Sequence, residues 1–147
     1  MNSIPRAQPE PRSAYKVFRS ISTRWSDNDV YGHVNNTVYY SWFDTAINGL
    51  LMDSGALDIK VGAVIGLVVE TQCNYFAPLA FPGEVVAGMR VAHIGSSSVR
   101  YEIAIFPESP DEPCAACGHF VHVYVDRIER KPAALPSPLI RLLETLT

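Results

Sequence analysis

A chain of 147 residues with 48% hydrophobic content is long enough for a single domain with a buried core. Its formal net charge of -3 provides no basic field, which argues against nucleic acid or an anionic membrane surface as a partner. The three cysteines, an odd number, suggest no disulfide framework and favour a reducing cytoplasm. No apolar run reaches transmembrane length, and the longest, 61–69, predicts a buried strand.

The N-terminal residues 1–13 are polar and lack the apolar core of a secretory signal, so we expect a flexible arm. A strand is predicted over 14–25, where apolar and polar residues largely alternate. The residues expected on its apolar face are Tyr15, Val17, Ile21, Thr23 and Trp25.

A helix is predicted from Thr37 to Asp53, because apolar residues recur there at a spacing of three or four. The expected apolar stripe consists of Tyr39, Trp42, Phe43, Ala46, Ile47, Leu50 and Leu51. Asn35 or Asn36 is a suitable N-cap, and Gly55 a suitable C-terminal stop. At about 1.5 Å per residue this helix would be roughly 25 Å long, enough to lie along a whole sheet.

Four further strands are predicted over 61–76, 83–94, 97–106 and 115–126, separated by turn residues. A proline-rich stretch then leads to a short helix over 139–146. One long helix and about five antiparallel strands predict an α+β fold, with the helix packed on one sheet. We therefore expect residues 14–147 to form a single domain.

The segment 27–36, Asp-Asn-Asp-Val-Tyr-Gly-His-Val-Asn-Asn, lies between the first predicted strand and the long helix. It brings carboxylates, an imidazole, a glycine and amides to the positive end of that helix. Backbone N–H groups at a helix start can hold a developing oxyanion, while a nearby acid or histidine carries the chemistry. This combination predicts hydrolysis of an activated acyl group.

These residues and several later ones resemble the hot-dog fold acyl-CoA thioesterases of the 4-hydroxybenzoyl-CoA thioesterase-like family. The resemblance covers Tyr15 to Pro136, and its matching stretches are 24–29, 32–36, Tyr39, 42–46, 95–99 and 122–127. It implies a curved antiparallel sheet wrapped around the long helix, and two subunits that form active sites at their interface. A homodimer or homotetramer acting on acyl-CoA, without metal or cofactor, is therefore expected.

Carried over from the family, catalysis falls on Asp29, either as a general base for water or as a nucleophile on the thioester carbonyl. The N–H groups of Gly32, His33 and Val34 would polarise that carbonyl. Plant acyl-carrier-protein thioesterases have a similar stretch, but with asparagine at the position of Tyr31. The alternative for Asp29 is a turn carboxylate, a common role for Asp near Gly and Asn.

The neighbouring polar residues have structural alternatives as well. His33 serves either catalysis or the packing of the turn, and Asp27 is expected to pair with Arg24 or with backbone. Asn35 and Asn36 are expected to cap the helix and position the site. Two further acids are considered, each with a structural alternative. These are Asp44 on the helix and Glu70 in an apolar strand.

The segment Cys114-Ala-Ala-Cys117-Gly-His119-Phe-Val-His122 contains four potential zinc ligands in nine residues. On a regular strand Cys117 and His119 would share one face and His122 would point to the other, so zinc is disfavoured. A redox dithiol is likewise disfavoured, since no βαβ context surrounds the Cys-x-x-Cys pair.

Coenzyme A carries phosphates that need cations and hydroxyl donors. The candidates are Arg90, Arg100, Ser97 and Ser98, each of which is also an ordinary surface residue type. Two alternatives to an acyl-CoA thioesterase stay open. One is an acyl-carrier-protein thioesterase, and the other is a non-catalytic acyl-CoA-binding hot-dog protein.

Overall fold

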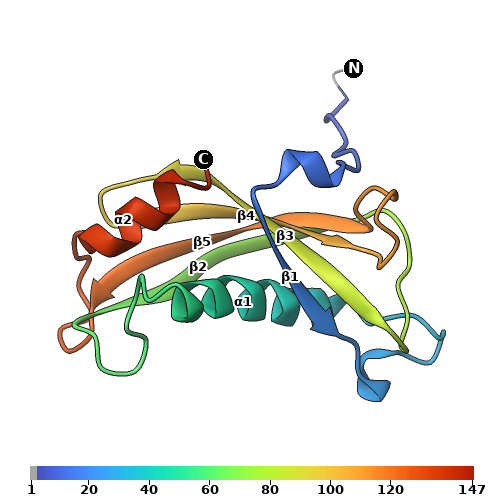
Figure 1. Ribbon diagram of the computed structural model, residues 1–147, viewed down its shortest axis with the longest axis horizontal. Coiled ribbons are helices and arrows are strands. Elements are labelled where there is room, and N and C mark those ends of the chain that lie inside the picture. Colours follow the sequence, from blue (N-terminus) through green and yellow to red (C-terminus); the bar gives the residue numbers. More distant parts are fainter. Residues whose placement is uncertain (1–2) are drawn as a thin grey trace.

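The computed structural model describes residues 3–147. Its five strands form one antiparallel sheet in the order β1-β3-β4-β5-β2, and the long helix α1 lies along one face of it (Figure 1). The elements are β1 Val17–Ser22, α1 Asn36–Asp53, β2 Val64–Tyr75, β3 Glu84–Ile94, β4 Ser98–Phe106, β5 Ala116–Asp126 and α2 Ser137–Glu144. The prediction of an α+β hot-dog arrangement is confirmed.

Helix α1 has the ends that its sequence favours. The Asn35 side chain accepts a hydrogen bond from the Thr37 N–H at 3.0 Å, which confirms Asn35 as the N-cap. Gly55 follows the C-cap Ser54 with a φ of 68°, a left-handed conformation that glycine adopts without strain. The buried residues of the helix are Tyr39, Trp42, Phe43, Ala46, Ile47 and Leu51, while Leu50 is half-buried.

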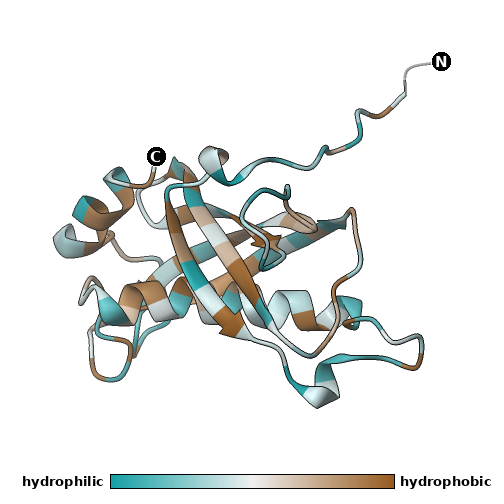
Figure 2. Ribbon diagram, turned by 45° about the vertical axis from the view of Figure 1, so that its right-hand side comes forward, coloured by the Kyte–Doolittle hydropathy of each residue, from teal (hydrophilic) through white to brown (hydrophobic). Residues whose placement is uncertain are grey.

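The main core lies between α1 and the face of the sheet that α1 covers. Apolar and polar residues alternate along the strands, so every second side chain enters this core (Figure 2). The contributing strand residues include Val85, Ala87, Met89, Val91, Val99, Tyr101, Ile103, Ile105, Phe120 and Tyr124. A second, smaller cluster forms on the outer face around Tyr15 and Phe106. Helix α2 starts earlier than predicted, at Ser137, because proline is tolerated in the first turn.

Two strand predictions differ from the structure. The first strand ends at Ser22, and Trp25, expected on its apolar face, is 83% exposed in a short 3-10 turn over Trp25–Asp27. The apolar run 61–69 is not a buried strand either, since β2 forms an edge of the sheet and, within residues 3–147, pairs only with β5. Within it Leu67, Val68 and Val69 are exposed.

The N-terminal segment meets the outer face of the sheet at Glu10. The Glu10 carboxylate pairs with Arg90 at 2.9 Å, and the Cys114 N–H donates to the Glu10 carbonyl at 3.0 Å. The Arg12 guanidinium donates to the Pro107 carbonyl at 2.8 Å. Among residues 3–147, no helix combines the length and apolarity that crossing a membrane requires.

Candidate active site

The segment that leads into α1 is anchored by a buried carboxylate. Asp27 is 0% exposed and accepts hydrogen bonds from the Arg24 N–H at 2.7 Å and from the Arg24 guanidinium at 2.9 and 3.0 Å. The predicted pairing of Asp27 with Arg24 is therefore confirmed. The Asn35 N–H donates to the Asp27 carbonyl at 2.9 Å, so the same residue also holds the helix start.

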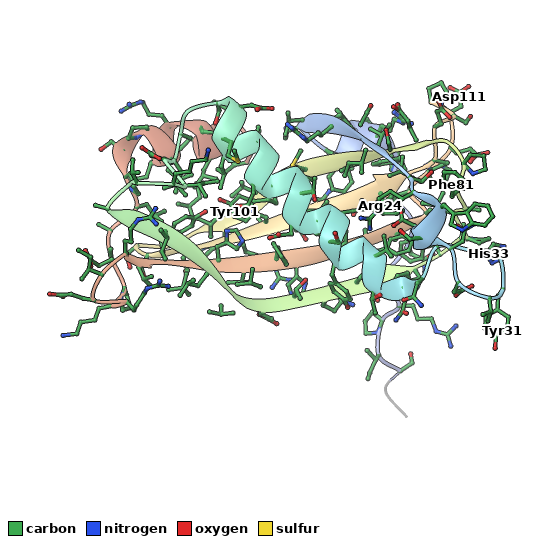
Figure 3. All side chains as sticks on the ribbon, turned by 90° about the horizontal axis from the view of Figure 1, so that it is seen from below. Arg24, Tyr31, His33, Phe81, Tyr101 and Asp111 are labelled. Carbon is green, nitrogen blue, oxygen red and sulfur yellow. The ribbon has the colours of Figure 1, made fainter. Side chains whose placement is uncertain are left out.

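The segment is also tied to residues far along the chain. The Asn28 side-chain oxygen accepts from the Phe81 N–H at 2.9 Å, and the Val34 N–H donates to the Leu79 carbonyl at 2.8 Å. Figure 3 shows Arg24, His33 and Phe81 gathered at one end of the molecule, beside the start of α1. The loop is thus held on the folded domain from both of its ends.

Asp29 lies in a tight turn that closes at His33. The Asp29 N–H donates to the His33 carbonyl at 2.8 Å, and the Gly32 N–H donates to the Asp29 carbonyl at 3.1 Å. Gly32 has a φ of 81°, which a residue with a side chain would adopt only with strain. The Asp29 side-chain Oδ1 accepts from the Tyr31 N–H at 2.8 Å. This bond fixes the carboxylate, and its Oδ2 has no donor within residues 3–147.

The side chains at the tip of the Asp29–His33 turn point toward solvent. His33 is exposed, and Tyr31 points away from the body of the molecule at the loop tip (Figure 3). Val30 beside Tyr31 is exposed as well, and Trp25 stacks edge-on against Phe81 with ring centroids 6.0 Å apart. Apolar side chains are therefore displayed around the half-buried Asp29.

The backbone N–H groups around the helix start differ in their availability. Those of Gly32 and Val34 already donate to carbonyls of the protein, so neither is available to a substrate carbonyl in this structure. The Thr37 N–H is taken by the Asn35 cap. Within residues 3–147, the N–H groups of His33 and Asn36 have no acceptor, and that of Asn36 lies at the positive end of α1.

A cavity of about 300 Å³ lies beside the start of α1. It is lined by Val34, Asn36, Tyr39, Tyr75 and the 76–78 segment. The Tyr75 hydroxyl donates to the Asn36 carbonyl at 2.8 Å, and the rings of Tyr39 and Tyr75 pack edge-on at 5.0 Å. Burial raises the pKa of Tyr39 to about 12 and that of Tyr75 above its usual range, so both hydroxyls stay protonated.

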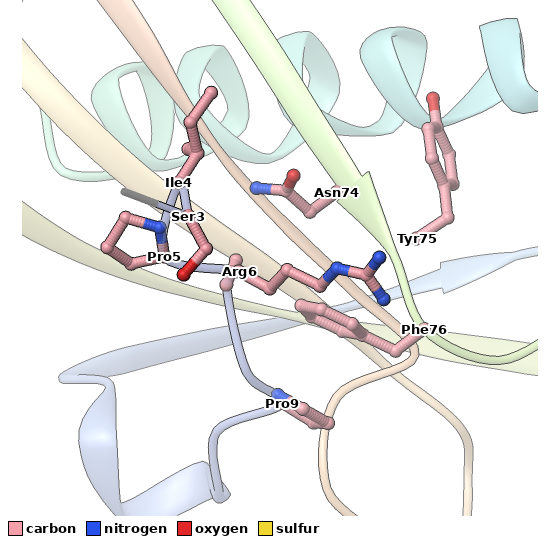
Figure 4. Close-up of a pocket in the computed structure, with 9 residues that line it drawn as sticks. Ser3, Ile4, Pro5, Arg6, Pro9, Asn74, Tyr75 and Phe76 are labelled. Atoms are coloured by element: carbon pink, nitrogen blue, oxygen red, sulfur yellow. The ribbon is translucent and has the colours of Figure 1, made fainter. Parts of the chain in front are cut away.

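Tyr75 was not among the predicted site residues. It comes from the end of β2, 39 positions along the chain from Asn36. The aromatic pair Tyr75-Phe76 before Pro78 was a signal in the sequence, but only the fold brings it to the helix start. The same two aromatic residues also border a second cavity of about 880 Å³, formed with the N-terminal segment from Ser3 to Pro9 (Figure 4). Arg6 places a guanidinium in this second cavity.

The two further acids do not lie with Asp29. Asp44 is exposed on α1 and accepts from the Asn48 side chain at 2.9 Å. It is eight residues after Asn36, which is about 12 Å along a helix that rises about 1.5 Å per residue. Glu70 lies on the outer face of β2, and its carboxylate is 3.4 Å from His119.

The residues expected to hold coenzyme A are dispersed in the single chain. Arg90 and Arg100 line a cavity on the outer face of the sheet, and Arg90 is paired with Glu10 and Glu102. Ser97 and Ser98 lie where β4 begins, at the end of the sheet away from Tyr75. The structure therefore brings residues 27–36 together, whereas the four candidates for binding coenzyme A lie away from this segment.

The family is established by sequence. The model of the Thioesterase superfamily matches residues 31–114, more than half of the chain, so the protein belongs to the thioesterase superfamily. No curated protein gives a significant match to this chain.

Solved structures agree with this assignment. The PA5185 protein from Pseudomonas aeruginosa strain PAO1 is 51% identical over 95% of this chain and 97% of its own, with a TM-score of 0.92. The chain is also similar to a 1,4-dihydroxy-2-naphthoyl-CoA thioesterase from Synechocystis (19% identity, 86% and 93% covered, TM-score 0.76). A DHNA-CoA thioesterase from Staphylococcus aureus matches at 22% identity, with 87% and 86% covered and a TM-score of 0.74. The structural similarity to these two thioesterases shows that this chain shares their fold.

Proposed function

We propose that this protein hydrolyses acyl-CoA thioesters to a free acid and coenzyme A. The observation that carries the proposal is the available Asn36 N–H at the start of α1, in a residue that lines a cavity together with Tyr39, Tyr75 and Phe76. A thioester carbonyl oxygen placed there would accept this hydrogen bond and be stabilised by the positive end of the helix. Membership of the thioesterase superfamily supports the reaction type, and the names of the two distant neighbours favour coenzyme A as the carrier.

Asp29 is the proposed catalytic carboxylate, acting as a nucleophile or a general base. Its Oδ1 is held by the Tyr31 N–H, which leaves Oδ2 to act on a substrate or on water. In one route Oδ2 attacks the carbonyl carbon, the thiolate of coenzyme A leaves, and water hydrolyses the resulting anhydride. In the other route Oδ2 takes a proton from water, which attacks the carbonyl directly, and the tetrahedral intermediate then expels the thiolate of coenzyme A. Asn36 has the same role in both routes, since a negative oxygen develops in each.

The decisive experiment is thiol release from a panel of acyl-CoAs, short to long and aliphatic to aromatic. Asp29→Asn is expected to lower kcat/KM by about 100- to 10,000-fold, the range typical of a lost acid–base group. Asp126→Asn is the control for loss of a turn carboxylate, because the Asp126 side chain also accepts backbone N–H groups, at the end of the sheet opposite Tyr75 in the same chain. If Asp29→Asn folds and keeps full turnover, the assignment fails and His33, Asp44 and Glu70 are tested next.

An inactive wild-type protein would have a different meaning. If no acyl-CoA releases thiol, the same panel is repeated with acyl-carrier-protein thioesters. Turnover with those substrates would change the proposed carrier to the acyl-carrier protein, and the proposed active site would stay the same. Binding of acyl-CoA without turnover of either carrier would instead identify a non-catalytic acyl-CoA-binding protein.

We further propose that the active unit is a homodimer, alone or within a tetramer, formed along β2. This edge strand of 12 residues exposes Leu67, Val68 and Val69, and one side of its backbone pairs with no other strand of the described part of the chain. An apolar edge of this length is a template for pairing with another strand. Antiparallel pairing about a two-fold axis would set the start of one β2 beside the end of the other. The partner would then complete the cavity at Tyr75.

A further inference from the structure

The N-terminal segment before Glu10 forms one side of a cavity of about 880 Å³ at the end of β2 (Figure 4). The other side consists of Asn74, Tyr75 and Phe76. A volume of this size is typical of sites that bind small molecules or cofactors. The segment therefore does more than precede the domain, since it encloses a ligand-sized space together with the sheet.

This larger cavity adjoins the one at the start of α1. Tyr75 and Phe76 line both cavities. The Tyr75 hydroxyl donates to the Asn36 carbonyl, whereas Phe76 packs with the cluster around Tyr15 on the outer face of the sheet. The two cavities therefore meet at this aromatic pair, on the way from the helix start to the N-terminal segment.

The charge in the larger cavity comes from one residue. Among its described lining residues Arg6 alone is charged, and Figure 4 shows its side chain pointing toward Tyr75 and Phe76. Within residues 3–147 Arg6 forms no ion pair, whereas Arg90 is paired with two carboxylates. Arg6 thus keeps its whole charge for an anion. A guanidinium suits a phosphate in particular, because its planar N–H groups match two phosphate oxygens.

The chain around Arg6 restricts where this guanidinium can go. Arg6 is four residues before Glu10, whose carboxylate pairs with Arg90 at 2.9 Å and whose carbonyl accepts the Cys114 N–H. Four residues span at most about 14 Å even when fully extended. Pro5 and Pro9 fix their own φ and favour an extended conformation in the residues before them. Binding at Arg6 therefore needs little further ordering of the chain.

On the basis of the proposed hydrolysis of acyl-CoA, we propose that Arg6 binds a phosphate group of coenzyme A. Pantetheine separates the phosphates of coenzyme A from its thioester, so a phosphate site must lie beyond the cavity that holds the carbonyl. The larger cavity has this position relative to Asn36, and Tyr75 and Phe76 would border the pantetheine between them. Either the diphosphate or the 3′-phosphate has the chemistry that a guanidinium recognises. Arg6 was not among the predicted coenzyme A residues, because its segment was expected to be only a flexible arm.

The test is equilibrium binding of coenzyme A, dephospho-coenzyme A and pantetheine, measured by titration calorimetry. Arg6→Gln is expected to weaken the binding of coenzyme A by about tenfold, as for loss of a charge-assisted hydrogen bond, and to leave that of pantetheine unchanged. An equal loss with dephospho-coenzyme A would assign the contact to the diphosphate. No loss with it would assign the contact to the 3′-phosphate.

Arg141→Gln is the matched control for charge. Arg141 is exposed on α2, toward the end of the molecule away from the start of α1 (Figure 1). This variant is expected to bind coenzyme A like the wild type. Three results would overturn the proposal: no binding of coenzyme A by the wild type, unchanged affinity in Arg6→Gln, or an equal loss in both variants.

These titrations are independent of turnover, so the phosphate site and the hydrolytic function can fail separately. A wild type that hydrolyses acyl-CoA while Arg6→Gln binds coenzyme A normally would refute the phosphate site alone. Weakened binding in Arg6→Gln of a protein without turnover would refute hydrolysis alone. In an active enzyme Arg6→Gln should raise KM for acyl-CoA by about tenfold with kcat unchanged. Turnover of an acyl-N-acetylcysteamine thioester, which has no phosphate, should be the same in both proteins.

Discussion

His122 makes the stability of this fold sensitive to acid. The ring is 3% exposed and is surrounded by the aromatic rings of Tyr101, Phe120 and Tyr124. Its Nδ1 is 3.3 Å from the Tyr124 hydroxyl, which itself bonds the Tyr101 hydroxyl at 2.7 Å. Burial lowers the pKa of His122 from 6.5 to about 4, because the charged imidazolium would lose its hydration in this core.

The magnitude follows from that shift. An unfolded chain binds the proton near pH 6.5, whereas the native protein resists it until about pH 4. Within this window the unfolded state carries more protons, so the free energy of unfolding falls as the pH falls. Above the window the full stability is present. A difference of about 2.5 pKa units corresponds to about 3 kcal/mol lost across the window.

The assay is urea unfolding of the wild type and of His122→Gln, each at about pH 7.5 and about pH 4, with the chain concentration held constant. The glutamine cannot titrate but can still accept from the Tyr124 hydroxyl. Carboxylates elsewhere affect both proteins equally, so the comparison isolates His122. We expect the wild type to lose about 3 kcal/mol more than the variant on acidification. Parallel losses in the two proteins would refute the reasoning.

Three other substitutions test the Asp27 anchor, the Asn35 helix cap and the proposed interface along β2. Asp27→Asn removes a buried charge from its guanidinium partner and is expected to lower the free energy of unfolding by about 2–3 kcal/mol in chemical denaturation; a loss under about 0.5 kcal/mol would contradict its anchoring role. Asn35→Ala is expected to cost about 1 kcal/mol by removing the helix cap, and unchanged stability would show that the cap is dispensable. Val69→Lys, at a residue 60% exposed near the middle of β2, should yield monomers in analytical ultracentrifugation. Ser20→Lys on the opposite edge strand should not, and equal behaviour of the two variants would argue against a β2 interface.

Short-range features were predictable because neighbouring residues along the chain determine them. The spacing of Tyr39, Phe43 and Ile47 identified the buried face of α1, since side chains three and four apart share one side of a helix. The cap at Asn35 and the pairing of Asp27 with Arg24 were predicted for the same reason, since both bonds span no more than three residues. The motif at 27–36 also indicated the thioesterase family, which the family match confirms.

Strand limits and exposure were less predictable. The apolar run 61–69 has the composition of a buried strand, but its exposure depends on its place at the sheet edge, and no local pattern encodes that place. Trp25 likewise follows the alternation of β1, yet the bonds to Asp27 turn the chain before it can join the strand.

What the sequence by itself determined is the α+β architecture and the position of the chemical motif, because hydrophobic periodicity and turn residues act over a few positions. The tertiary structure decided which groups of that motif are available. Contacts between distant segments occupy the Val34 N–H, bring Tyr75 to Asn36, and place β2 at an edge of the sheet. Such pairings depend on how strands and loops far apart in the chain are aligned, so they exist only once the whole sheet has formed.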